Sequence, residues 1–215
     1  MLLGVLLGCV GVTAADVPYA VDNDVVRIIK AVDVPHHRGA LHRHVVNRVM
    51  IYLDGGDMTL VHEDGRKEEQ HWKAGEVAWS PADGLHTSEN VGSAPIHLVE
   101  IELKRPAPAG PTARKAELDP VAIDPEHNIL LFENDQVRVF RSWREPGGTE
   151  LMHEHTGAGR AAVLLTDLDA SVKLPDGTTS RAHGVAGDVI WSGPVTHAGT
   201  NLGSKKFEMI IVEVK

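Results

Sequence analysis

The stretch His42-Arg43-His44 decides how this chain of 215 residues is interpreted, because it has a counterpart in His153-Glu154-His155. Each pair of histidines is followed by a third histidine, His86 in the first half and His197 in the second. The two pairs are 111 residues apart, and so are the two later histidines. Two sets of three histidines at one spacing indicate an internal duplication.

The duplication extends well beyond the histidines. Asn23-Asp24-Val25-Val26-Arg27 matches Asn134-Asp135-Gln136-Val137-Arg138, and residues 99–104 match 210–215, all at the same offset of 111. Between the histidine pair and the third histidine the offset becomes 112, as for Arg48 and Arg160. One insertion in the second copy is therefore cancelled by one deletion. Each copy is long enough to bury a core of its own.

The residue pattern of both copies predicts β-strands. Short runs rich in Val, Ile, Leu, Met and Trp alternate with polar turns such as Asp54-Gly55-Gly56-Asp57 and Pro175-Asp176-Gly177. No stretch shows a helical period, and strands of this length and spacing favour an antiparallel sandwich or barrel. We therefore predict an all-β protein of two domains, over residues 19–105 and 126–215. Residues 106–125 contain five prolines and are predicted to form a stiff linker.

The N-terminus predicts export. Residues 2–12 are apolar and are followed by Thr13-Ala14-Ala15, which is typical of a secretory signal peptide over residues 1–15. The run is too short to span a bilayer, which takes ~20 apolar residues. Leu6-Leu7-Gly8-Cys9 also resembles a bacterial lipobox, so a lipid anchor at Cys9 is the alternative to simple cleavage. The expected location is periplasmic or secreted.

Composition limits the partners. The formal net charge is −9 with no basic cluster, so nucleic acid is not an expected partner. The single cysteine excludes a disulfide within the chain. Edge strands could pair two chains, which leaves a homodimer open.

The two halves resemble the cupin superfamily, and together they resemble a bicupin. The residues that carry the resemblance occur in the same order in each half: His42, His44, Arg48, Gly55, Gly75, Pro81, Gly84, His86 and Asn90, then His153, His155, Arg160, Gly187, Pro194, His197 and Asn201. The resemblance implies two tandem jelly-roll barrels, also called double-stranded β-helices. It does not imply one function, because this superfamily includes dioxygenases, isomerases, decarboxylases, binding proteins and storage proteins.

The histidines predict metal sites. Residues i and i+2 of a strand face the same side, so His42 and His44 point together, as do His153 and His155. With His86 and His197 they would form two sets of three imidazoles, which suit Fe, Mn, Zn or Ni and leave coordination positions open. Glu150 is the one nearby carboxylate that we consider as a fourth ligand. The alternative is a polar barrel lining without metal.

At two of these motif positions the residue type differs from the usual pattern, because most metal-binding cupins carry a glutamate ligand where this chain has Arg48 and Arg160. A guanidinium cannot bind a metal and repels one unless an anion lies between them. Either the two arginines bind the carboxylate of a small substrate, or each pairs with an internal acid such as Glu102 or Glu213. Asn90 and Asn201 are predicted to stabilise turns.

Three hypotheses for function follow. The chain is an exported metal-dependent enzyme, an oxygenase or isomerase acting on a small anionic molecule; or a protein that binds a metal or small acid without catalysis; or a structural bicupin without metal. Bound metal with open coordination, binding without turnover, and absence of metal would distinguish them.

Overall fold

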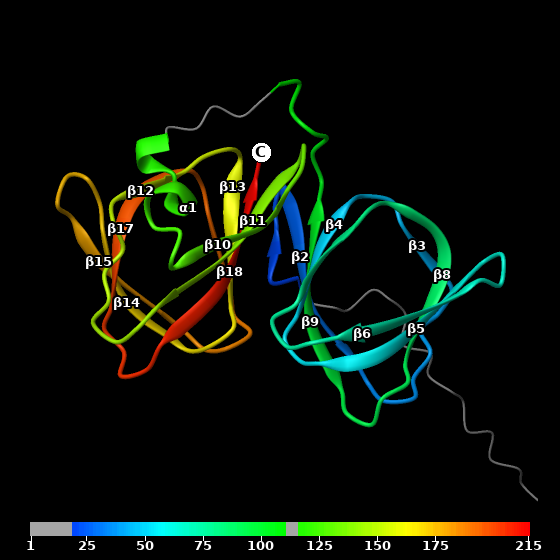
Figure 1. Cartoon of the computed structure of the whole chain (residues 1–215). Helices are drawn as coiled ribbons and strands as arrows, with labels where there is room; N and C mark the ends of the chain where they lie inside the picture. The colour runs from blue at the N-terminus through cyan, green and yellow to red at the C-terminus, as the bar shows by residue number, and fades with distance from the viewer. Residues whose placement is uncertain (1–18, 111–115) are drawn as a thin grey trace, which may run out of the picture.

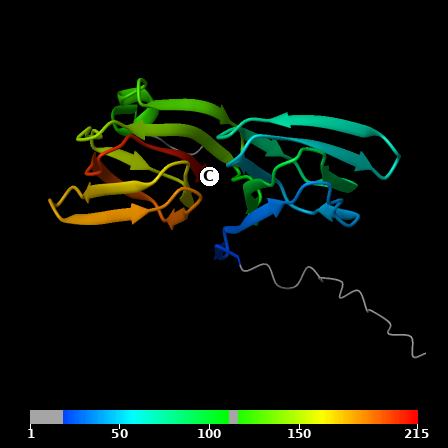
Figure 2. The same cartoon turned by 90° about the horizontal axis from the view of Figure 1, so that it is seen from below.

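The computed structural model describes residues 19–110 and 116–215, and folds them into two β-barrels that lie side by side (Figures 1 and 2). Each barrel has one five-stranded and one four-stranded antiparallel sheet. In the N-terminal barrel, the spatial order of the five-stranded sheet is β1 (Val21–Asp22), β2 (Val26–Asp33), β9 (Ile96–Leu103), β4 (Arg48–Tyr52) and β7 (Val77–Ser80). In the C-terminal barrel, it is β10 (Asn128–Glu133), β11 (Val137–Arg144), β18 (Phe207–Val214), β13 (Gly159–Leu164) and β16 (Val189–Ser192).

The four-stranded sheets close the other side of each barrel. In the N-terminal barrel, the strand order is β3 (His42–His44), β8 (Asp83–Asn90), β5 (Gly56–His62) and β6 (Lys67–Trp72). In the C-terminal barrel, it is β12 (His153–His155), β17 (Val195–Asn201), β14 (Leu168–Lys173) and β15 (Thr179–Gly184). The strand order is the same in both barrels, which confirms the predicted all-β fold of two tandem jelly rolls.

Equivalent polar side chains make equivalent hydrogen bonds in the two barrels. The Asn90 amide nitrogen donates to the carbonyls of residues 33 and 94, and its oxygen accepts from the backbone of residue 92. Asn201 does the same with residues 144, 205 and 203. Asn23 and Asn134 each accept from the two backbone amides that open β2 and β11. The repeat in the sequence is therefore a repeat of structure.

The two five-stranded sheets pack against each other, and their central strands β9 and β18 are largely buried on both faces. Alternate residues of β9, such as Val99 and Ile101, join a core shared with Val139, Ile210 and Val212 of the other barrel. The residues between them face their own barrel's interior. Burial on both faces explains why residues 209–212 form a continuous apolar run instead of alternating with polar residues.

The segment predicted as a linker has structure at its end. Residues 116–118 form a 3₁₀ turn and α1 spans Pro120–Ile123. Asp119 caps α1 by accepting from the amide of Val121, and it makes two bonds of 2.8 and 3.1 Å to the Arg138 guanidinium. Residues 116–123 thus pack on the C-terminal barrel. In residues 19–110 and 116–215, we find no helix that could cross a membrane.

Candidate metal centres

Each barrel gathers its three histidines from two neighbouring strands. His42 on β3 lies directly opposite His86 on β8, and His153 on β12 lies opposite His197 on β17. Within each set, one ring nitrogen per residue lies within 4.8 Å of the others. The second set is fully buried, whereas His42 and His44 are partly exposed. Both sets have the donor type and spacing to hold a metal ion.

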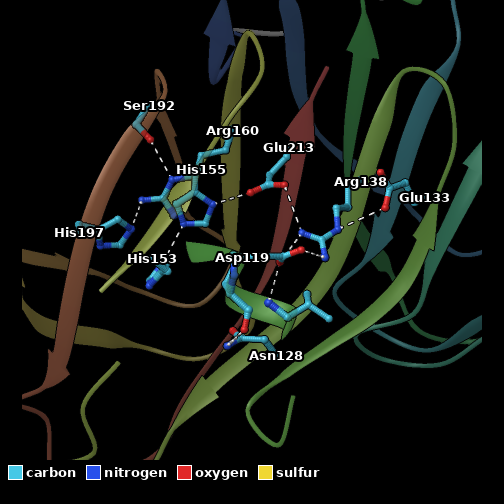
Figure 3. A network of polar contacts seen from close by, with 12 residues as sticks. Asp119, Asn128, Glu133, Arg138, His153, His155, Arg160, Ser192, His197 and Glu213 are labelled. Atoms are coloured by element: carbon cyan, nitrogen blue, oxygen red, sulfur yellow. Dashed lines mark hydrogen bonds and ion pairs between the residues drawn. The ribbon is translucent and has the colours of Figure 1, made fainter. Parts of the chain in front are cut away.

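In the C-terminal set, the Nε2 atoms of His153 and His155 face each other, and the partners of their Nδ1 atoms determine which nitrogen carries the proton. The Nδ1 of His153 lies 2.8 Å from the carbonyl oxygen of Leu151, and the Nδ1 of His155 lies 2.7 Å from Glu213 Oε1 (Figure 3). Both oxygens accept, so both Nδ1 atoms carry the proton, and in a neutral ring Nε2 then presents a lone pair.

The two Nε2 atoms of His153 and His155 are only 3.1 Å apart. Two lone pairs at that distance repel unless an extra proton or a metal cation lies between them. Two imidazoles bound to one metal at ~2.0–2.1 Å place their nitrogens about 3 Å apart. The observed separation therefore fits two ligands of a single metal, each oriented by an outer acceptor.

The third histidine of this set is held neutral. Burial, and next the positive charge of Arg160, lower the pKa of His197 to about 2. The Arg160 Nη2 lies 3.2 Å from His197 Nε2, and its Nε donates to Ser192 Oγ at 3.1 Å (Figure 3). A metal that takes the lone pair of His197 competes with Arg160 for it.

Arg160 has no ion-pair partner among residues 19–110 and 116–215. The nearest acids are engaged elsewhere, Glu213 by His155 and Arg138, and Glu150 by Arg144 at 4.0 Å. Burial lowers the pKa of the Arg160 guanidinium, although Glu150 and Glu213 oppose that effect. A partly buried guanidinium without a counter-charge is unfavourable, so this one is available to an anion.

In the N-terminal set, a guanidinium instead of a carboxylate lies behind one of the histidines. The Arg48 Nη1 lies 2.7 Å from His44 Nδ1 and donates to Glu100 Oε2 at 2.7 Å. Because a guanidinium only donates, His44 accepts at Nδ1 and carries its proton on Nε2. That Nε2 lies 3.0 Å from the Nε2 of His42, whose Nδ1 donates to the Ala40 carbonyl at 2.8 Å. With these hydrogen bonds, His44 presents an N–H toward His42, where a metal ligand would present a lone pair.

Comparison with known proteins shows which solved structures share this fold. No protein-family model and no curated protein sequence matches the chain. Among solved structures, AerE from Microcystis aeruginosa is 11% identical with a TM-score of 0.59, over 90% of this chain and 94% of that one. Oxalate decarboxylase from Bacillus subtilis, a protein with Mn(II) centres, is 13% identical with a TM-score of 0.62, over 88% of this chain and 69% of that one.

A variant of salicylate 1,2-dioxygenase from Pseudoaminobacter salicylatoxidans, in complex with gentisate, is 10% identical with a TM-score of 0.58, over 88% of this chain and 68% of that one. These neighbours are cupin-fold proteins. The chain has the bicupin fold. The resemblance stated from the sequence is therefore confirmed for the fold, and identities this low carry nothing further.

The difference between the two sites of the bicupin comes from the placement of its carboxylates. Glu102 in β9 is the counterpart of Glu213, but Arg27 holds it at 3.0 Å. Glu100 occupies the position where the C-terminal barrel has Ile211, and it draws Arg48 toward His44. Arg48 therefore pairs with an internal acid, and the partner is Glu100 instead of the expected Glu102.

In the C-terminal barrel, Asp119 leaves Glu213 available to its histidine. Asp119 binds Arg138 through both oxygens, and Glu213 Oε2 lies 3.9 Å from the same guanidinium (Figure 3). Glu213 Oε1 is thus directed at His155. The sequence did not single out Asp119, because it precedes the second repeat, nor Glu100, although its mismatch with Ile211 was a visible signal.

Each set of histidines lies in a cavity. The C-terminal cavity has a volume of about 180 Å³, and Glu150 and Arg160 contribute its two charged side chains besides the histidines. Glu150 is not among the groups within ligand distance of the three histidines. The N-terminal cavity, of about 580 Å³, is lined by Asp33, Glu68 and Glu100 in addition to Arg48.

Proposed function

We propose that the C-terminal barrel is the active centre of a metal-dependent enzyme, with His153, His155 and His197 holding a divalent metal. The observation that carries this proposal is the pair of acceptor nitrogens 3.1 Å apart on His153 and His155. Imidazole ligands suit Zn, Cu, Fe and Ni, so the donor set does not identify the metal. Three protein ligands leave further positions for water or substrate.

We propose further that the substrate is a small anion. A dication and the Arg160 guanidinium repel each other across His197, and an anion between them removes that repulsion. The fork geometry of arginine suits a carboxylate. Two of the structural neighbours act on or bind small carboxylates, namely oxalate and gentisate. These observations support a carboxylate held between the metal and Arg160.

The chain's own residues then have distinct tasks. When bound, the metal acts as a Lewis acid on a substrate oxygen, which serves an oxygenase or an isomerase. Arg160 binds and orients the carboxylate, Glu213 fixes the ring of His155, and the apolar wall excludes water. Glu150 is the one carboxylate of the cavity lining, and it is the group we assign to proton transfer.

Metal-dependent turnover tests the proposal. Protein purified without an affinity tag is loaded with Fe²⁺, Mn²⁺, Zn²⁺ or Ni²⁺ and offered small carboxylates, with oxygen uptake and proton NMR as readouts. We expect turnover in the wild type and in His44→Ala, and none in His155→Ala. Equal turnover in His155→Ala would contradict the assignment. Binding of carboxylate by the loaded protein without any turnover would leave a binding protein.

We also propose that the chain is exported. The support is the apolar run and small residues of the N-terminus, which lie outside the described residues. Mass spectrometry of the mature protein from the source cells measures this directly. A mature N-terminus after Ala14 or Ala15 supports cleavage, a lipidated Cys9 supports an anchor, and an intact Met1 in the cytosolic fraction contradicts export.

A further inference from the structure

We infer that the C-terminal cavity selects a monocarboxylate with a compact apolar body, such as a benzoate-like or short branched acid. This inference rests on the proposed function and names the substrate class of that site. It follows from three properties of the cavity: the position of its one unpaired cation, its volume, and the chemistry of its remaining wall.

The cavity has one group suited to a carboxylate. Arg160 donates to Ser192 through Nε, and its Nη2 lies 3.2 Å from His197 Nε2. Its Nη atoms have no carboxylate partner among the described residues, unlike those of Arg48, which Glu100 occupies. An incoming carboxylate therefore meets the guanidinium beside His197, next to the position proposed for the metal.

Most of the rest of the wall is apolar, although Asn128, Ser142 and Ser192 also line the cavity. The apolar part includes Phe140, Ala162, Ala170, Phe207, Met209 and Ile211. The small residues Ala162 and Ala170 stand where the N-terminal barrel has Met50 and Met58, which follows from the matching strand registers. Within the C-terminal cavity, the two alanines leave space for an apolar group that methionine side chains at these positions would occupy.

The volume sets the size of that group. The cavity measures about 180 Å³. An apolar cavity of roughly 150 Å³ in another protein binds benzene and stays dry. The C-terminal cavity therefore has room for one six-membered ring, or a branched chain of similar size, together with a carboxylate near Arg160.

A second carboxylate that points away from Arg160 and from the proposed metal would meet no cation in the cavity wall. Glu150, with a side chain 12% exposed, is the other charged group of the wall, and it carries the wrong sign. Arg144, which lies 4.0 Å from Glu150, is held at 2.9 Å by Asp124. Burying a second negative charge against apolar side chains is unfavourable. Compact dicarboxylates such as oxalate and malonate leave the apolar part of the cavity unfilled, so they gain less from burial than a monocarboxylate with an apolar body.

Titration of the tag-free protein with Co²⁺, followed by its visible absorption, tests this inference without any turnover. The titration is run alone and with benzoate, isobutyrate, oxalate or malonate, each corrected for metal that the acid binds in solution. We expect benzoate and isobutyrate to tighten Co²⁺ binding by roughly 10-fold, within the usual range of coupling between two sites. Oxalate and malonate should have the smaller effect.

Three variants test separately the charge of Arg160, the space beside Ala170 and the matched position Met58 of the N-terminal barrel. Arg160→Gln should bind Co²⁺ more tightly alone, because a like charge is gone, and should no longer respond to benzoate. Ala170→Leu fills the apolar end, so it should bind Co²⁺ normally and lose the response to benzoate. Met58→Leu, the matched change in the N-terminal barrel, should behave as wild type.

The outcomes distinguish the two proposals. Co²⁺ binding that benzoate does not change, or that oxalate tightens more than benzoate, overturns the monocarboxylate assignment and leaves the metal site standing. Failure to take up Co²⁺ overturns the proposed function. In that case, calorimetric titration of the metal-free protein with benzoate tests the monocarboxylate assignment separately. Benzoate binding that is lost in Arg160→Gln and in Ala170→Leu supports the assignment. The absence of benzoate binding to the wild type overturns it.

Discussion

The two barrels of this bicupin have the same strand order, the same three histidines and the same asparagine turns, yet their histidines carry their protons differently. In the C-terminal barrel a carboxylate receives the Nδ1 proton of His155, so its lone pair faces the centre. In the N-terminal barrel a guanidinium faces the Nδ1 of His44, so an N–H faces the centre. From this comparison we propose that the group behind each ring, which decides the nitrogen that offers a lone pair, makes the C-terminal histidines the better metal site.

The largest expected effect is the gain of a second metal. In Arg48→Met the guanidinium that donates to His44 is gone, and Glu100, 2.7 Å from the lost Nη1, becomes the nearest acceptor for a proton on Nδ1. We expect metal content to rise from one to two per chain, measured by inductively coupled plasma mass spectrometry. In the matched Arg160→Met variant it should stay at one. A folded Arg48→Met protein with one metal would contradict the account of the N-terminal site.

A smaller effect is expected at the acid behind His155. Glu213→Gln removes the negative charge that orients and polarises the ring, and such outer partners typically contribute about 10–100-fold in metal affinity. Its counterpart Glu102 pairs with Arg27, so Glu102→Gln should leave affinity unchanged. Calorimetric titration with Zn²⁺ measures both. Equal losses in the two variants would show that the carboxylates act through stability alone.

A weaker effect is expected one contact further out, at Asp119. Asp119→Asn keeps an N-cap for α1 but loosens Arg138, which then competes with His155 for Glu213. We expect about 5-fold weaker Zn²⁺ binding, below the effect of changing a direct partner of a ligand. Glu133→Gln alters the other acid near Arg138, at 3.4 Å, and serves as the control with little change. Identical affinities in Asp119→Asn and wild type would remove Asp119 from the network.

The smallest difference between barrels is expected at the asparagine turns. Asn90 and Asn201 are buried and make three equivalent hydrogen bonds each. Replacing either by alanine should lower the free energy of unfolding by about 1–3 kcal/mol. Chemical denaturation should give losses of similar size for both variants. A large loss at only one of them would mean that the scaffolds differ as much as the sites do.

Much of the fold was predictable from the sequence. The duplication, the two barrels and strands such as β18 follow from the offset of 111 and from short apolar runs. The outer strands β6 and β15 were not predicted, because sequences such as Lys67-Glu68-Glu69-Gln70-His71-Trp72 are mostly exposed and lack apolar alternation. The helix at Pro120–Ile123 was missed because four residues give no period.

The histidine sets were predictable from spacing, but their partners were not. Glu100 and Glu102 lie two residues apart on β9 and face the same side, so the sequence cannot say which of them Arg48 meets. The structure decides it, because Arg27 already holds Glu102. Protonation in these sites depends on side-chain contacts between strands far apart in sequence, which no local pattern records.

The most direct test of the central claim is a count of metal ions in tag-free protein reconstituted with Zn²⁺, in the wild type, His44→Ala and His155→Ala. The account predicts one metal per chain in the wild type and in His44→Ala, and none in His155→Ala. Two metals in the wild type, or a single metal that is lost in His44→Ala and kept in His155→Ala, would contradict the claim that the C-terminal barrel is the metal site.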